Sequence, residues 1–219
     1  MFLVNTRPDI CFAVNTLSQQ MVEPHHFHWV GAKNLLRYLR GAINHGLRYT
    51  AGSVILRGYT DADWAGSVVD RKSTSGYCFT LGSASISWMS RKQKSVALST
   101  AEAEYIAASM ACCEAVWLRK LFSELFEHVL DTTVILCDNQ SGIHLSENPV
   151  FHDRSKHIDI RDHFIRDMVQ RGAVRLDHIG TDEQVANILT KPLGKVKFLT
   201  FCESLGVVER PYDVGPVGR

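Results

Sequence analysis

The sequence predicts an α/β protein built on a mixed five-stranded sheet with helices on its faces. Two patterns support this prediction. Between residues 54 and 98, short apolar segments are separated by Gly and Ser, which is typical of antiparallel strands joined by tight turns. Between residues 133 and 190, apolar segments alternate with helical ones, which favours parallel pairing through crossovers. A chain of 219 residues has room for one such domain and an appendage.

The first fifty residues are expected to form two amphipathic helices. Pro8 stands where a helix can begin, and Pro24 separates two runs of apolar residues at helical spacing. Gly41 and Gly46 end the second run. These helices must bury their apolar faces on another surface, and we expect them to pack beside the sheet rather than inside its core.

The later elements are expected where the hydrophobic period changes. Strands are expected at residues 54–61, 76–81, 85–89, 96–98, 133–137 and 173–179. Helices are expected from residue 99 to about 125 with a break near Cys112, and at residues 140–146, 158–170 and 182–190. An apolar helical patch follows at Phe198, Phe201 and Leu205, and the last residues are expected to fray.

Composition limits the classes of protein that this chain can belong to. The formal net charge is +1, so a nucleic-acid partner would require a local basic patch. The six cysteines lack paired C-x-x-C spacing and are expected to be reduced thiols. Arg7 and Asp9 interrupt the apolar start before a signal peptide could form, and no apolar run approaches membrane-spanning length. We therefore expect a soluble, intracellular protein that is not secreted.

Three carboxylates are expected at the ends of secondary-structure elements. Asp61 closes an apolar run and is followed by small residues and Gly66, although Asp is a poor strand former. Such a position is usually retained because the carboxylate binds a cation or a reacting group. Glu104 lies at a helix start, and Asp138 closes a second apolar strand. Together they favour a metal site over three capped loops.

Six segments resemble, in their order along the chain, the ribonuclease H of copia-type long-terminal-repeat retrotransposon Pol polyproteins. They are Thr60–Gly66 (TDADWAG), Arg71–Gly76 (RKSTSG), Ala101–Tyr105 (AEAEY), Cys137–Ser141 (CDNQS), Lys156–Arg161 (KHIDIR) and Ile188–Leu193 (ILTKPL). Each segment alone is a weak signal, but this many in one order is specific. The resemblance runs through almost the whole chain and implies a ribonuclease H-like fold.

The resemblance also implies a division of the chain. Residues 1–52 are similar to the C-terminal end of the reverse transcriptase, residues 53–193 to the ribonuclease H domain, and residues 194–219 form a tail. The chain would then be a C-terminal fragment of the polyprotein. The polymerase palm is missing and no Asp-Asp pair occurs in the sequence, so we predict no DNA synthesis.

The three carboxylates suit phosphodiester hydrolysis. Two divalent ions held about 4 Å apart can activate water and relieve the charge on the leaving oxygen. Mg²⁺ fits this task because it keeps several waters and needs few carboxylates, and Mn²⁺ is a possible substitute. As the resemblance implies, Asp61 would bridge both ions, while Glu104 and Asp138 would each hold one.

Two neighbouring acids compete for the ligand role. Ser99 followed by Glu102 forms a capping box, which assigns Glu102 to the helix start. Residues two apart on a helix point about 200° apart, so Glu104 faces elsewhere and matches the family's glutamate. Asp63 shares a strand face with Asp61, but a turn-capping role fits it better.

The fourth site position departs from the family. Copia-type proteins usually carry an Ala-Asp pair before the ILTKPL segment, where this chain has Asn187 after Ala186. An amide oxygen can coordinate Mg²⁺ but brings no charge, so weaker ion affinity and weakened activity are expected. Glu183, one helical turn earlier, either compensates for the lost charge or is solvated.

Two basic segments are expected to position the phosphates of a nucleic acid. They contain Arg91, Lys92 and Lys94 in the first segment, and Arg154, Lys156, His157 and Arg161 in the second. A zinc site is disfavoured because the histidines of the second segment have no spaced Cys partner.

The predicted function is endonucleolytic cleavage of the RNA strand of an RNA–DNA hybrid during reverse transcription. The expected partners are the hybrid and the remainder of the reverse transcriptase in a polyprotein, with no membrane; the oligomeric state is not predicted. The expected location is the cytoplasm, with a virus-like particle or the nucleus as alternatives. Two other functions stay open: a decayed or domesticated binding remnant that lost turnover through Asn187, and a DNA-cutting nuclease of the integrase or resolvase type.

Overall fold

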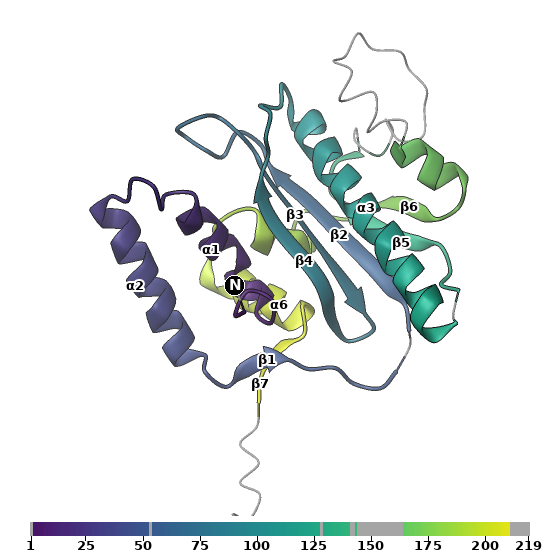
Figure 1. Cartoon of the computed structure of the whole chain (residues 1–219), viewed down its shortest axis with the longest axis horizontal. Helices are drawn as coiled ribbons and strands as arrows, with labels where there is room; N and C mark the ends of the chain where they lie inside the picture. Colours follow the sequence, from purple (N-terminus) through teal and green to yellow (C-terminus); the bar gives the residue numbers. More distant parts are fainter. Residues whose placement is uncertain (1, 53, 128, 141–142, 144–163, 211–219) are drawn as a thin grey trace, which may run out of the picture.

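A five-stranded mixed sheet forms the centre of the molecule. The structure is a computed structural model and describes residues 2–52, 54–127, 129–140, 143 and 164–210. The strands are β2 (Leu56–Asp63), β3 (Thr74–Leu81), β4 (Ala84–Lys92), β5 (Thr133–Cys137) and β6 (Val174–His178), in the order β4-β3-β2-β5-β6 (Figure 1). The first three are antiparallel, whereas β5 and β6 run parallel to β2. The predicted fold class is thereby confirmed.

The pairing of β2 with β5 positions two of the predicted site residues. The last residue pair of this parallel ladder is Thr60 with Cys137. Asp61 and Asp138 follow these residues directly, so both carboxylates stand at the same edge of the sheet. The expectation that these two strands are neighbours is confirmed.

Helix α3 (Thr100–Phe126) packs on one face of the sheet (Figure 1). Its buried residues form an apolar cluster with sheet residues such as Phe79 and Ile135. The expected break near Cys112 is wrong: the helix is continuous, because Cys112 is fully buried and packs as a small apolar side chain.

The opposite face of the sheet is covered by segments from both ends of the chain. These are the 3₁₀ helix η1 (Pro8–Ile10), α1 (Cys11–Ser18), the 3₁₀ helix η2 (Val185–Leu189) and α6 (Lys195–Ser204). Cys11, Leu189 and Phe201 share one buried cluster with Cys78 of β3. The N-terminal helix α1 therefore packs beside the sheet as expected, together with the C-terminal α6. The division of the chain at residues 52 and 193 stays a prediction.

Two short strands have no counterpart in the sequence-based expectation, and the second expected N-terminal helix packs differently than expected. Strand β1 (His45–Leu47) pairs antiparallel with β7 (Val207–Glu209), which joins two distant segments of the chain. Helix α2 (His26–Gly41) stands away from the sheet and contains no buried residue (Figure 1). The expectation that both N-terminal helices bury their apolar faces is wrong for α2, which leaves an open apolar groove of about 820 Å³ against α1.

Three other expected elements differ from the structure. Residues 96–98 form no strand, because this segment turns toward α3 and the Ala97 carbonyl accepts a hydrogen bond from the Trp64 indole. Only residues 185–189 of the expected helix at 182–190 are helical, and the side chain of Gln184 caps them. The expected helices at 140–146 and 158–170 fall largely outside the described residues, although residues 164–170 are helical.

Candidate active site

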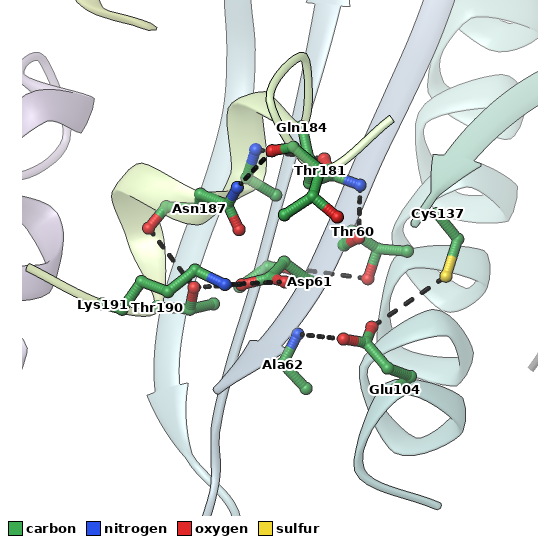
Figure 2. Close-up of polar contacts among 12 residues, drawn as sticks. Thr60, Asp61, Ala62, Glu104, Cys137, Thr181, Gln184, Asn187, Thr190 and Lys191 are labelled. Atoms are coloured by element: carbon green, nitrogen blue, oxygen red, sulfur yellow. Dashed lines mark hydrogen bonds and ion pairs between the residues drawn. The ribbon is translucent and has the colours of Figure 1, made fainter. Parts of the chain in front are cut away.

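Asp61 lies near the end of the central strand β2 and is almost fully buried, with 1% of its surface exposed. Its carboxylate accepts a hydrogen bond from the Thr190 hydroxyl. The Lys191 ammonium lies 3.5 Å from both carboxylate oxygens (Figure 2). A buried carboxylate is expensive unless it is paired, so these two contacts stabilise it here.

Glu104 comes from the N-terminal part of α3, just after its first turn, and is buried beside Asp61. One of its carboxylate oxygens accepts a hydrogen bond of 3.2 Å from the backbone N–H of Ala62, the residue after Asp61 (Figure 2). Glu102 points elsewhere, since its carboxylate accepts from the Leu98 N–H at 2.8 Å while Ser99 caps the helix. The structure therefore gives Glu102 the capping role and brings Glu104 to the strand end.

Asp138 follows β5 directly and is half-buried. Ligand atoms of Glu104, Cys137 and Asp138 all lie within 4.8 Å of one another. Asp61 adds a fourth group close enough for its charge to act on Glu104. Three carboxylates from β2, α3 and the end of β5 thus converge on one edge of the sheet.

The electrostatics of this cluster favour a cation. Burial, together with the charges of Asp61 and Asp138, raises the pKa of Glu104 to about 9. Burial also raises the pKa of Asp61, and the positive charge of Lys191 opposes that shift. Carboxylates that repel one another in a buried place ionise readily only when a cation is present. The cluster is therefore suited to bind a divalent ion.

The donor set indicates which kind of ion would fit. Three of the four groups offer carboxylate oxygens, and the fourth is the Cys137 thiol, whose Sγ lies 3.9 Å from a Glu104 oxygen. Burial raises the pKa of this thiol well above its ordinary value, so forming the thiolate that a soft metal ion prefers is costly here. Hard oxygen donors suit Mg²⁺ and Mn²⁺ better than zinc.

The sequence of this chain is similar to those of known retrotransposon proteins. The chain is 45% identical over 219 residues to the retrovirus-related Pol polyprotein from transposon RE2 of Arabidopsis thaliana, a match that covers 100% of the chain and 15% of the polyprotein. It is also 45% identical over 205 residues to the one from transposon TNT 1-94 of Nicotiana tabacum, covering 94% of the chain and 15% of that protein. The chain belongs to the Pol polyproteins of copia-type retrotransposons. It spans about one seventh of the length of these curated relatives.

A solved ribonuclease H1, LC11-RNase H1 isolated from compost, is 14% identical and aligns with a TM-score of 0.47 over 63% of this chain and 93% of that one. No family model matches the chain.

Within the described residues, no helix has the length and apolar character needed to span a bilayer.

The fourth copia-type position, Asn187, lies on η2 and is fully buried. Its side-chain amide donates to the Thr181 carbonyl at 3.0 Å, while its Oδ1 atom has no hydrogen-bond partner among the described residues. Its backbone carbonyl accepts from the Thr190 hydroxyl at 3.3 Å. Glu183 is exposed, which favours the solvated alternative for that residue. A role for Asn187 in metal binding stays a prediction.

Three contributors to this copia-type site were missed from the sequence. Gln184 is fully buried, and its amide donates to the carbonyls of Thr60 at 2.9 Å and Leu136 at 3.2 Å, which joins η2 to β2 and β5. Thr190 and Lys191 hold Asp61. Thr190 and Lys191 belong to the ILTKPL segment that carried the resemblance, so the sequence did contain a signal for them. No sequence pattern pointed to Gln184.

The first basic segment lies at the end of β4. Because β2, β3 and β4 alternate in direction, this end shares an edge of the sheet with Asp61, and Thr74 pairs with both Asp63 and Lys92. Arg91 and Lys94 are exposed, and Lys92 forms a 2.9 Å ion pair with Asp70. The second segment, Arg154, Lys156, His157 and Arg161, lies outside the described residues. Nucleic-acid binding by either segment stays a prediction.

Proposed function

We propose that this chain hydrolyses the RNA strand of RNA–DNA hybrids in a magnesium-dependent, two-metal reaction that serves retrotransposon reverse transcription. The observation that carries the proposal is the convergence of Asp61, Glu104 and Asp138 from three different elements on one sheet edge. Membership of the copia-type Pol polyproteins supports the same reaction class.

Asp61, Glu104 and Asp138 would hold the divalent ions. When bound, the ions lower the pKa of water and offset the charge that develops on the leaving oxygen. The protein positions the ligands: the Ala62 N–H orients Glu104, and Gln184 ties together the ends of β2 and β5. Burial of Asp61 and Glu104 keeps the site's dielectric low, which strengthens attraction between carboxylates and cations.

The hybrid would be held through its phosphates by the exposed side chains of Arg91 and Lys94, at the same edge of the sheet as the acidic cluster. Such contacts give affinity that falls with salt. Selection of RNA over DNA requires contacts to the 2′-hydroxyl groups. We further propose that the chain acts beside the polymerase part of the same polyprotein, in the cytoplasm or within a virus-like particle or nucleus.

The test is a cleavage assay with three labelled substrates: RNA–DNA hybrid, duplex DNA and duplex RNA. Each is incubated with the purified chain in magnesium, in manganese or in chelator. Cleavage of the hybrid's RNA strand alone, lost in chelator and in Asp61→Asn, is the expected result. Cleavage of duplex DNA would instead support the integrase or resolvase type, and salt-sensitive hybrid binding without cleavage would support the binding remnant.

A further inference from the structure

Lys191 places a positive charge inside the acidic cluster of this copia-type chain. Its ammonium lies 3.5 Å from each oxygen of the Asp61 carboxylate, and its charge favours the ionised forms of Asp61, Asp63 and Glu104. Within the described residues, no other ammonium or guanidinium forms an ion pair with Asp61, Glu104 or Asp138. Lys191 therefore occupies the electrostatic position that a bound cation would take.

The side chains of Asp61 and Lys191 differ in their freedom to move. The Asp61 side chain is 2% exposed and is fixed by the Thr190 hydroxyl, whereas 32% of the Lys191 side chain is exposed. A lysine has a long flexible stem, so its ammonium can leave the carboxylate for the open side of the cluster without displacing η2. Asp61 has no such freedom, because it lies in the central strand.

A divalent ion and the Lys191 ammonium compete for the same carboxylate. Both need the Asp61 oxygens, and like charges repel at such distances. An ammonium released toward solvent beside a nucleic-acid site has phosphate oxygens as its natural acceptors, since lysine binds phosphate as a point charge.

We propose that Lys191 is a positioning residue that exchanges partners, an inference that rests on the proposed function. Lys191 neutralises Asp61 in the metal-free site and transfers to a phosphate of the hybrid when divalent ions bind. This exchange keeps the buried Asp61 paired at every stage. It also couples occupation of the metal site to capture of the substrate.

The exchange predicts two affinity changes of opposite sign in Lys191→Met. Removing the competing charge should tighten manganese binding to the metal-free protein by about 3- to 10-fold, a range typical of one charge pair at a partly exposed site. Removing the phosphate contact should weaken binding of a labelled RNA–DNA hybrid in calcium, by a similar factor. A purely structural lysine would not shift the two affinities in opposite directions.

The measurements are manganese titration followed by electron paramagnetic resonance, without nucleic acid, and fluorescence anisotropy of the hybrid. The matched control is Lys197→Met, whose side chain is 33% exposed and pairs with Asp182 at 2.9 Å instead of Asp61. Lys191→Arg keeps the charge and should remain close to wild type in manganese binding. Thermal melting of each metal-free variant checks that it folds. If Lys191→Met fails to fold, Lys191→Arg still tests the proposal, because strongly altered manganese binding in Lys191→Arg would overturn the exchange.

The outcomes separate this proposal from the proposed function. Unchanged or weaker manganese binding in Lys191→Met, or tighter manganese binding with unchanged hybrid affinity, would overturn the exchange. If Asp61→Asn binds manganese as well as wild type, the proposed metal site is itself wrong. If Lys191→Met shows the opposite affinity shifts but the wild-type chain cuts no hybrid, the exchange is supported and the proposed activity is wrong.

Discussion

Gly76 lies directly opposite Asp61 in the β2–β3 ladder, and its missing side chain leaves room for the end of η2. A Cβ atom at Gly76 would lie 2.8 Å from Leu189 Cβ and 2.8 Å from Thr190 Cγ2. Close-packed interiors cannot absorb such contacts without displacement. The glycine of the RKSTSG segment therefore lets Thr190 reach the Asp61 carboxylate.

We expect Gly76→Ala to push η2 away from the sheet. The free energy of unfolding should fall by about 1–3 kcal/mol, as in other overpacked cores. Hybrid cleavage should fall by about tenfold or more, because small misplacements of a site group carry large rate costs. Urea denaturation and initial rates measure both effects. Gly46→Ala is the control, since no atom lies within 4 Å of a Cβ built there.

The sequence was informative about the acidic residues because each lies near the end of an element. Asp61 lies near the end of β2 and Asp138 directly follows the neighbouring strand β5, so correct strand prediction was enough to place them together. The contacts of Thr190 and Lys191 depend on how η2 packs on β3, which no local pattern determines. The pairing of β1 with β7 was equally unpredictable, because both strands are three residues long and distant in sequence.

Asp61→Asn should abolish cleavage and leave most hybrid binding intact. The amide keeps the shape of the carboxylate but loses the charge that attracts divalent ions, whereas the phosphate contacts remain. The measurement uses metal-free protein to which magnesium is added back, with hybrid binding followed across a salt series. Full turnover in this variant would exclude Asp61 from the site.

The metal-free protein should lose stability as pH rises from about 5 to 9. Burial and neighbouring acids raise the pKa of Glu104 from 4.5 to about 9, so the folded state binds more protons than the unfolded state in this window. Stability is therefore fully present below the unfolded pKa and declines toward pH 9, by at most about 1.4 kcal/mol per pH unit for one proton.

Urea denaturation in chelator at several pH values tests this linkage. Glu104→Gln should show a smaller dependence on pH, because the amide does not titrate, and saturating magnesium should reverse the trend in the wild type. Identical slopes for wild type and Glu104→Gln would mean that Glu104 is ionised in the folded, metal-free protein.

Gln184→Met should lower both stability and turnover. The buried amide donates to the Thr60 and Leu136 carbonyls, and its loss leaves polar groups without a partner at a cost of about 1–3 kcal/mol. These carbonyls flank the strand ends that carry Asp61 and Asp138, so turnover should fall more than hybrid affinity. The exposed Gln170 gives the control Gln170→Met. Equal turnover in Gln184→Met and Gln170→Met would show that the hydrogen bonds of Gln184 do not position the carboxylates.

Asn187→Asp should lower the magnesium concentration needed for half-maximal cleavage and, at the same time, destabilise the metal-free protein. A carboxylate adds attraction for a divalent ion that water screens only partly in a buried place. It also replaces the amide that donates to the Thr181 carbonyl with an acceptor, which leaves two acceptors facing each other. Bound magnesium should offset this cost, because the unpaired Oδ1 position then gains a cation.

Magnesium titrations of cleavage and of melting temperature, run on wild type and Asn187→Asp together, test both effects. Manganese should rescue the wild type more than the variant, because manganese binds oxygen and nitrogen donors more strongly and tolerates a site that lacks one charge. Glu183→Gln is the matched control, since Glu183 is exposed and its loss should move neither curve. Overlapping magnesium curves would mean that Asn187 does not face the ions, and inactivity of both proteins would favour the binding remnant.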